Sequence, residues 1–145
     1  MPPKILLIED SPDDVELTRL AFQQNRIANE IAVAASGDEA LRCLFGDDGG
    51  REPLDVSIVL LDLKLPKVSG IEVLRQIRAN ERTRFIPVIV LTSSDEQRDL
   101  VDSYRLGANS YVRKPVDYNE FVEAVRQLGI YWLLVNQPPP IPEEP

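Results

Sequence analysis

The sequence predicts an α/β fold, a single domain in which a five-stranded parallel sheet is covered by helices on both faces. Three short runs of Ile, Val and Leu support this prediction: Ile5–Ile8, Ile58–Leu61 and Val88–Leu91. None of them alternates with polar residues, which is typical of strands buried on both faces. Helical patterns separate the strand candidates, and this alternation is typical of a doubly wound sheet with right-handed crossovers.

Two weaker runs complete the expected sheet. Ile31–Ala34 and Ser110–Arg113 are short, and each lies between two helical patterns. Pro87 stands directly before the third apolar run, at a strand start where proline is tolerated. The chain is therefore expected to repeat strand and helix five times.

The first helix has a clear start. Ser11 is a good N-cap, Pro12 suits the first helical position, and Asp13 and Asp14 place acids in the first turn. The apolar residues expected on its buried side are Val15, Leu17, Leu20, Ala21 and Ile27.

Four more helices are predicted from similar signals. Their expected starts are Gly37-Asp38, the residue after Ser69, Ser94-Asp95 and Asp117. The second is expected to run through Leu44, and the fourth to end near Gly107. The third and fifth helices also contain apolar residues at helical spacing. These are Ile71, Leu74 and Ile77 in the third helix and Phe121, Val122, Val125 and Leu128 in the fifth.

Composition excludes several classes of protein. The 145 residues carry 24 acids and 16 bases, a net charge of −8, which disfavours nucleic-acid binding. The chain has no His, so Ser-His-Asp triads, Cys-His pairs and His-ligated zinc are excluded. Cys43 is the only cysteine, which fits a reducing cytoplasm, and it is expected to fill space on a helix.

The chain is expected to divide into a domain over residues 1–135 and a proline-rich tail over residues 136–145. No apolar segment approaches the length that a membrane span or a signal peptide needs, so a cytoplasmic protein without membrane contact is expected. No further DNA-binding or catalytic domain is expected after residue 135.

Polar side chains follow the predicted strands where their carboxyl ends meet. Glu9 and Asp10 follow the first strand, Asp62 the third, Thr92 ends the fourth, and Lys114 follows the fifth. Each could be an ordinary turn, cap or surface residue when taken singly. Ligands of open α/β sheets bind at this edge, so the residues are expected to form one site.

The chemistry of this set points to phosphoryl transfer. Three carboxylates stay ionised together only with a compensating cation, and Mg²⁺ prefers such oxygen ligands. A carboxylate can attack phosphorus and form an aspartyl phosphate. Lys114 and the Thr92 hydroxyl can bind phosphoryl oxygens, and none of these steps requires His.

The sequence resembles the receiver domain of two-component response regulators over about residues 4–128. The matching pieces are Ile-Leu-Leu-Ile-Glu9-Asp10, Asp62-Leu-Lys-Leu-Pro66-Lys-Val-Ser-Gly70, Val-Leu-Thr92-Ser-Ser and Ala-Asn-Ser-Tyr111-Val-Arg-Lys114-Pro115. The resemblance implies a flavodoxin-like receiver fold, in which βα is repeated five times. It also implies a signalling protein that catalyses only its own phosphorylation and dephosphorylation.

The resemblance implies a role for each matching position. Asp62 is the expected phosphoacceptor, and the metal ligands are Asp10, Asp62 and the backbone carbonyl of Lys64, with Glu9 reaching the metal through water. Lys114 is expected to pair with the phosphoryl group and to precede a cis-proline, Pro115. These two positions adjoin the fifth strand.

Thr92 and Tyr111 match the switch pair of the family, which changes the face made by the fourth helix, fifth strand and fifth helix. Tyr111 could equally be an ordinary strand aromatic. Ser93 and Lys64 occupy positions where the family varies its side chains, which can tune the lifetime of the phosphoryl group.

A narrower resemblance concerns the partner. Asp-Ser-Pro-Asp-Asp near the start, the loop at Gly46–Gly50 and Ile-Tyr-Trp-Leu-Leu-Val-Asn near the end look like single-domain regulators that work with bacterial phytochrome histidine kinases. The apolar stretch that contains Tyr131, Trp132 and Leu133 supports an interface. A homodimer through the fourth helix, fifth strand and fifth helix is expected, and the alternative for the apolar stretch is that it folds back onto the domain's own core.

Three rival interpretations are weaker. A haloacid-dehalogenase-type phosphatase needs a second Asp two places after the nucleophile, where this chain has Lys64. A flavodoxin needs a phosphate-binding loop after the first strand, but Glu9–Asp14 is acidic and would repel phosphate. A degenerate receiver that acts as a phosphorylation-independent interaction module remains the alternative within the family.

Overall fold

The computed structural model describes residues 3–93, 96–113 and 117–129. Five strands form one parallel sheet in the order β2-β1-β3-β4-β5. They are β1 (Lys4–Ile8), β2 (Ile31–Ala34), β3 (Val56–Leu61), β4 (Val88–Thr92) and β5 (Ser110–Arg113). The strand prediction is confirmed, with β3 starting two residues before the expected run.

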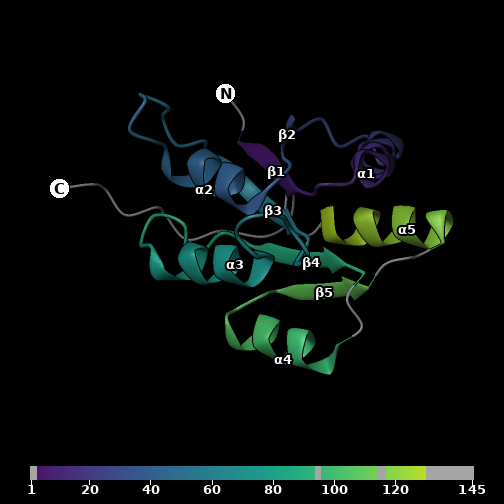
Figure 1. Cartoon of the computed structure of the whole chain (residues 1–145). Helices are drawn as coiled ribbons and strands as arrows, with labels where there is room; N and C mark the ends of the chain where they lie inside the picture. The colour runs from purple at the N-terminus through teal and green to yellow at the C-terminus, as the bar shows by residue number, and fades with distance from the viewer. Residues whose placement is uncertain (1–2, 94–95, 114–116, 130–145) are drawn as a thin grey trace.

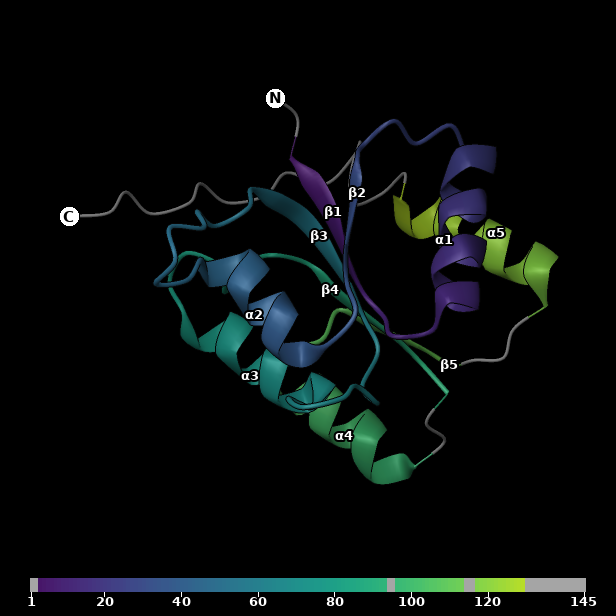
Figure 2. The same cartoon turned by 45° about the horizontal axis from the view of Figure 1, so that its top comes forward.

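Five helices alternate with the strands. They are α1 (Pro12–Gln24), α2 (Gly37–Phe45), α3 (Gly70–Ala79), α4 (Gln97–Arg105) and α5 (Tyr118–Gly129). Helices α1 and α5 lie on one side of the sheet, and α2, α3 and α4 lie on the other (Figures 1 and 2). The predicted doubly wound α/β fold is therefore confirmed.

Alternate strand residues supply two separate cores, because successive side chains point to opposite faces of a sheet. In β1, Leu6 and Ile8 join the core under α2 and α3. Ile5 and Leu7 join the core under α1 and α5, where Phe22 also packs. Both cores reach the strand ends, so they fix the residues that follow the strands.

Two predicted helix caps are confirmed. The Ser11 hydroxyl accepts a hydrogen bond from the Asp14 N–H at 3.3 Å, and the Ser69 hydroxyl accepts one from the Glu72 N–H at 3.2 Å. The predicted start of α4 is wrong, because Glu96 has an extended backbone and the helix begins only at Gln97. Serine is a better N-cap than glutamate, which is why the pattern indicated an earlier start.

The predicted buried side of α1 is wrong for Leu17 and Leu20 only, because Ala21 is buried as predicted. Leu17 and Leu20 are 43% and 40% exposed, whereas Thr18, Ala21 and Phe22 are buried. The Thr18 hydroxyl donates to the Asp14 carbonyl at 2.8 Å, so its burial leaves no polar group unsatisfied. Helix α1 can therefore bury Phe22 in the core, and this orientation leaves Leu17 and Leu20 exposed.

Val15 and Ile27 are partly buried against the same core as Phe22, as predicted. Cys43 is buried in the other core, which fits its predicted role as a space-filling residue. Across residues 3–93, 96–113 and 117–129, no helix combines the length and the apolar character needed to cross a membrane. Lys114, Pro115, the apolar stretch at Tyr131–Leu133 and the tail lie outside the described residues.

Candidate functional site

Hydrogen bonds between neighbouring strands bring the predicted acids together. The Asp62 N–H, just after β3, donates to the Ile8 carbonyl of β1 at 3.0 Å. The Glu9 N–H donates to the Ala34 carbonyl of β2 at 2.9 Å. The carboxyl ends of three adjacent strands are therefore aligned, as expected for ligand sites in open α/β sheets.

Glu9, Asp10 and Asp62 form one acidic cluster. Each offers a carboxylate oxygen, and these three oxygens lie within 4.8 Å of one another. Glu9 and Asp62 are only 3% and 6% exposed, while Asp10 is exposed. Carboxylates this close repel one another unless a cation compensates their charge. An all-oxygen set that leaves room for water suits Mg²⁺ or Mn²⁺.

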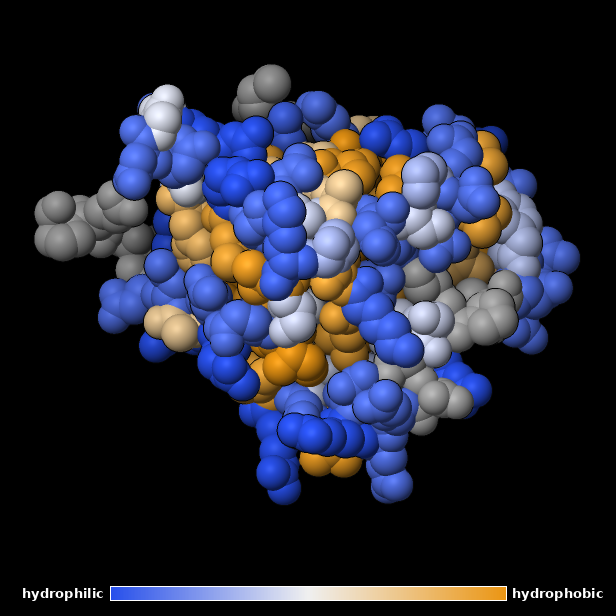
Figure 3. All heavy atoms as spheres, viewed as in Figure 1, coloured by the Kyte–Doolittle hydropathy of each residue, from blue (hydrophilic) through white to orange (hydrophobic). Residues whose placement is uncertain are grey.

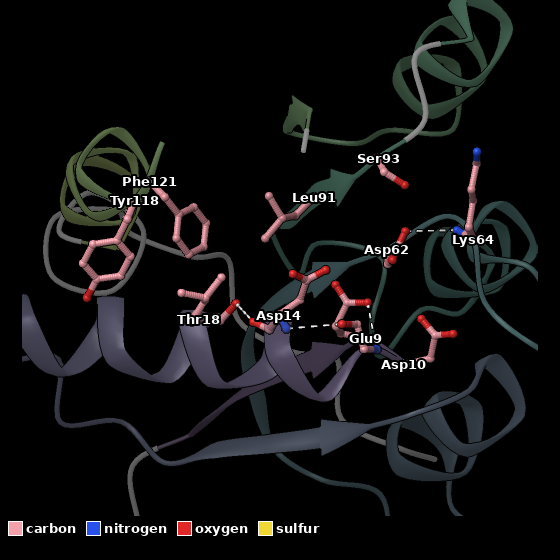
Figure 4. A pocket seen from close by; sticks show the side chains of 12 residues that line it. Glu9, Asp10, Asp14, Thr18, Asp62, Lys64, Leu91, Ser93, Tyr118 and Phe121 are labelled. Carbon is pink, nitrogen blue, oxygen red and sulfur yellow. Dashed lines mark hydrogen bonds between the residues drawn. The ribbon is translucent and has the colours of Figure 1, made fainter. Parts of the chain in front are cut away.

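Asp62 receives two hydrogen bonds on the same oxygen. The fully buried Thr92 hydroxyl donates to Asp62 Oδ1 at 2.8 Å, and the Lys64 backbone N–H donates to it at 3.1 Å. The side chain of Lys64 points away from the acids (Figure 4). The carboxylate is therefore held in one orientation by its own loop and by the end of β4.

Glu9 is fixed in a similar way. Its Oε2 atom accepts a hydrogen bond from the Ser11 N–H at 3.3 Å, across the short link between β1 and α1. Because Ser11 is also the N-cap of α1, the acidic pair and the first turn of the helix are parts of one rigid turn. The start of α1 thus helps to place the acids.

The acidic cluster opens into a pocket of about 460 Å³. Beyond the cluster its lining comes from α1, α5 and the end of β4 (Figure 4); these residues are Ser11, Asp14, Leu17, Thr18, Leu91, Ser93, Tyr118 and Phe121, together with Lys64. Asp14 was predicted only as a first-turn acid, but it lies in the site. The signal that could have placed it there is the three-residue link between β1 and α1, residues 9–11, which is too short to carry α1 away from the strand ends.

The other predicted residues fall in different places. Ser93 lines the pocket, as its position after β4 suggested. Tyr111 lies opposite Val90 in the β4–β5 register and packs, half-buried, against the core under α2 and α3. This position fits an ordinary strand aromatic, and its switch role stays a prediction. Lys114 and Pro115 are outside the described residues.

Comparison with known families agrees with this geometry. Residues 5–126 match the response regulator receiver domain. The chain belongs to this family. The match starts in β1 and ends within α5, so it includes every strand and the whole acidic cluster.

Individual relatives of this receiver are similar along most of their length. A probable methanogenesis regulatory protein of Methanothrix harundinacea, FilR2, is 41% identical over 93% of this chain and 86% of its own. The Mn²⁺-bound structure of the response regulator Rcp1, a Synechocystis protein, superposes with a TM-score of 0.86 over 96% of this chain and all of its own, at 32% identity. The bacteriophytochrome response regulator RtBRR is 48% identical, with a TM-score of 0.75 over 97% of this chain and 86% of its own.

Proposed function

We propose that this receiver accepts a phosphoryl group from a histidine kinase on Asp62, in a reaction that depends on Mg²⁺. The main support for the proposal is the acidic cluster, in which the buried Thr92 hydroxyl donates a hydrogen bond to Asp62. Three carboxylate oxygens lie within 4.8 Å of one another, and the Thr92 hydroxyl donates to one of the same carboxylates. The Mn²⁺-bound form of Rcp1 supports a divalent ion at this position.

The chemistry needs a nucleophile and charge neutralisation. A carboxylate oxygen of Asp62 attacks phosphorus, and a new O–P bond forms as the bond between phosphorus and the donor breaks. The donor leaves with the electron pair of the broken bond. Bound Mg²⁺ supplies neutralisation of the charge on the phosphoryl oxygens.

The remaining residues hold the reacting groups in place. Glu9, Asp10, Asp62 and the backbone carbonyl of Lys64 are the proposed metal-site residues. The Thr92 hydroxyl, now bonded to Asp62 Oδ1, can turn to a phosphoryl oxygen once Asp62 is modified. Lys114 is proposed to pair with another phosphoryl oxygen, and Pro115 to fix the peptide bond beside it.

The first test is phosphorylation by a small donor. The protein is incubated with Mg²⁺ and acetyl phosphate, and its intact mass is measured. We expect the gain of one phosphoryl group in the wild type and in Asp55→Asn, which changes an exposed acid just before β3 at the opposite end of that strand. Asp62→Asn should show no gain while keeping the fold, because the substitution is nearly isosteric.

Two results would contradict the proposal. Labelling of Asp62→Asn would place the acceptor elsewhere in the chain. A folded wild-type protein that gains no phosphoryl group from any donor would instead be a degenerate receiver, and the search would turn to a partner that binds it constitutively.

The proposed kinase is a bacterial phytochrome. Support comes from RtBRR, a bacteriophytochrome response regulator that is 48% identical to this chain. The test compares phosphotransfer from a phosphorylated bacteriophytochrome kinase with transfer from an unrelated histidine kinase, at equal concentration. We expect the phytochrome kinase to be the faster donor, and equal rates would contradict the assignment.

The proposed output is a switch of the α4-β5-α5 face that controls a homodimer. Helix α4 exposes Leu100, Val101 and Tyr104 by 37%, 41% and 52%, and a second copy could cover these side chains. The region of α4 at the bottom of Figure 3 is mostly hydrophilic, with a small hydrophobic area at its lower edge. Sedimentation at micromolar concentration, with and without phosphorylation, tests the dimer. Tyr104→Ala then tests the surface of α4, and alanine variants of Tyr131, Trp132 and Leu133 test the C-terminal apolar stretch. A protein that is monomeric both with and without phosphorylation would refute the homodimer.

A further inference from the structure

The loop that carries the proposed metal-site residues closes tightly on the start of α3. The Gly70 N–H donates to the Leu63 carbonyl at 3.0 Å. A Cβ atom added at Gly70 would lie 2.3 Å from the Asp62 carbonyl oxygen and 2.5 Å from the Leu63 Cα. The loop between β3 and α3, residues 63–69, is therefore pressed against α3 by backbone alone, with no side chain that could yield.

The same loop is held on its other side by the first turn of α2. The Gly37 N–H donates to the Pro66 carbonyl at 3.4 Å, and a Cβ added at Gly37 would lie 1.9 Å from the Val68 carbonyl oxygen. Lys67 has a φ of 68°, and its ammonium lies 3.9 Å from the Asp38 carboxylate. The contact between α2 and the loop therefore combines the close approach of Gly37 to the Val68 backbone with an ion pair between side chains.

The start of α2 is itself fixed relative to the acids. The Ser36 hydroxyl accepts from the Glu39 N–H at 3.4 Å, and the Glu39 carboxylate accepts from the Ala35 N–H at 3.2 Å. The neighbouring Ala34 carbonyl accepts from the Glu9 N–H at 2.9 Å. A continuous series of contacts therefore runs from Glu9 through the start of α2 to the loop that begins after Asp62.

We propose that the first turn of α2, which begins at Gly37, positions the phosphorylation site. Gly37 does not line the pocket at the acidic cluster and acts through the loop, so it is a positioning residue. The loop contains Lys64, whose N–H bonds Asp62 Oδ1 at 3.1 Å and whose carbonyl is a proposed metal ligand. Mg²⁺ demands near-ideal octahedral geometry, so a displaced loop weakens binding. This inference rests on the proposed function, because it assumes that the acidic cluster binds a divalent ion.

The test is the affinity for Mn²⁺, measured from the free-ion signal in electron paramagnetic resonance. In Gly37→Ala the added methyl must push the Val68 carbonyl away, and we expect Mn²⁺ to bind about 10-fold more weakly, as for other residues that orient metal ligands. The Mg²⁺ concentration that gives half-maximal phosphorylation by acetyl phosphate should rise by a similar factor.

Two control variants separate positioning from simple loss of stability. Gly49→Ala adds the same methyl in an exposed loop, where the nearest atom is a carboxylate oxygen of the flexible Asp47 side chain, at 3.4 Å. Ile58→Val loosens the core under α1 and α5 without touching the 63–69 loop. Both controls should bind Mn²⁺ as the wild type does, even where their unfolding midpoints fall.

The outcomes distinguish this inference from the proposed function. If the wild type binds no Mn²⁺ and is not phosphorylated, the proposed function fails. If the wild type binds Mn²⁺ and a folded Gly37→Ala binds it equally well, only the positioning role fails. Should Gly37→Ala not fold, Ser36→Ala loosens the same turn by removing its cap, and unchanged Mn²⁺ affinity in that variant would equally overturn the inference.

Discussion

Helices α3 and α4 lie on the same side of the sheet, but they are packed in opposite ways (Figure 2). Helix α3 buries Val73, Leu74 and Ile77, each 0% exposed. Helix α4 buries only Ser103 among its residues and turns its apolar side chains outward. Burial of apolar surface is what holds most protein helices in place, so α3 is fixed by its core whereas α4 is held weakly.

Polar contacts also differ between α3 and α4. At the end of α3 the Arg78 guanidinium donates to the Gly107 carbonyl at 2.7 and 3.0 Å, to the Arg84 and Ile86 carbonyls at 2.9 and 2.7 Å, and to Asn109 Oδ1 at 3.1 Å. Burial lowers the pKa of Arg78, but a guanidinium titrates so far above neutrality that it stays charged. Arg78 thus ties α3 to the loops before β4 and β5.

On α4 the corresponding inward group is the hydroxyl of Ser103, which is fully buried and has no hydrogen-bond partner among the residues that the structure describes. A buried hydroxyl without a partner destabilises the packed position. The receiver therefore combines a firmly packed α3, beside the acidic cluster, with a neighbouring helix, α4, that few packing contacts stabilise. This is the combination that the proposed switch of the α4-β5-α5 face requires.

The largest expected effect concerns the buried apolar residues of α3. Leu74→Ala leaves a cavity under α3, and we expect it to lower the free energy of unfolding by about 3 kcal/mol. Leu100→Ala removes the same atoms from the surface of α4 and should change it by less than about 0.5 kcal/mol. Urea denaturation measures both, and similar losses in the two variants would show that α4 is packed as firmly as α3.

The second prediction concerns Arg78. Arg78→Met keeps the apolar stem but leaves the three carbonyls without their charged donor, and we expect a loss of about 2 kcal/mol in unfolding free energy. The matched control is Arg75→Met, which breaks only an exposed pair with Glu72 and should lose less than about 0.5 kcal/mol. Hydrogen exchange should also become faster at Gly107–Asn109 in Arg78→Met only, and unchanged exchange would argue against the tie.

The sequence predicted both α3 and α4 as helices, but apolar periodicity indicated the buried side of α3 only. Leu74 and Ile77 stand at helical spacing after a Ser cap, so both the helix and its buried side followed from the pattern. In α4 the inward residue is Ser103, and nothing in the pattern indicates that a serine should face the sheet. The order of strands and acids predicted the site for a simpler reason, because parallel strands must end at one edge.

What the sequence could not predict depends on how side chains and elements pack, both within a helix and between distant segments. The inward turn of Thr18 on α1 depends on a hydrogen bond to the Asp14 carbonyl, and the support of the 63–69 loop by Gly37 depends on the relative placement of α2 and α3. A single glycine at a helix start looks the same in sequence whether it faces solvent or another backbone.

The third prediction tests the weak packing of α4 directly. Ser103→Ala removes the hydroxyl that has no partner, so we expect the unfolding free energy to rise by about 1 kcal/mol. If α4 moves on phosphorylation, the variant should also hold the unphosphorylated arrangement more firmly and show less phosphorylation-induced dimer. A loss of stability in Ser103→Ala would instead mean that water satisfies this hydroxyl in solution.

The smallest expected effect is an unchanged reaction rate of Cys43, which lies in the core shared by α2 and α3. Cys43 of α2 packs in the core that α3 shares, and burial raises the pKa of its thiol, so it stays protonated at neutral pH and reacts slowly with iodoacetamide. We expect the same slow rate before and after phosphorylation. A Tyr104→Cys variant should provide the contrast, because this exposed position on α4 would react quickly and at a rate that phosphorylation alters. If Cys43 also became faster on phosphorylation, the layer of α2 and α3 would open too, and the switch could not be confined to α4 and its neighbours.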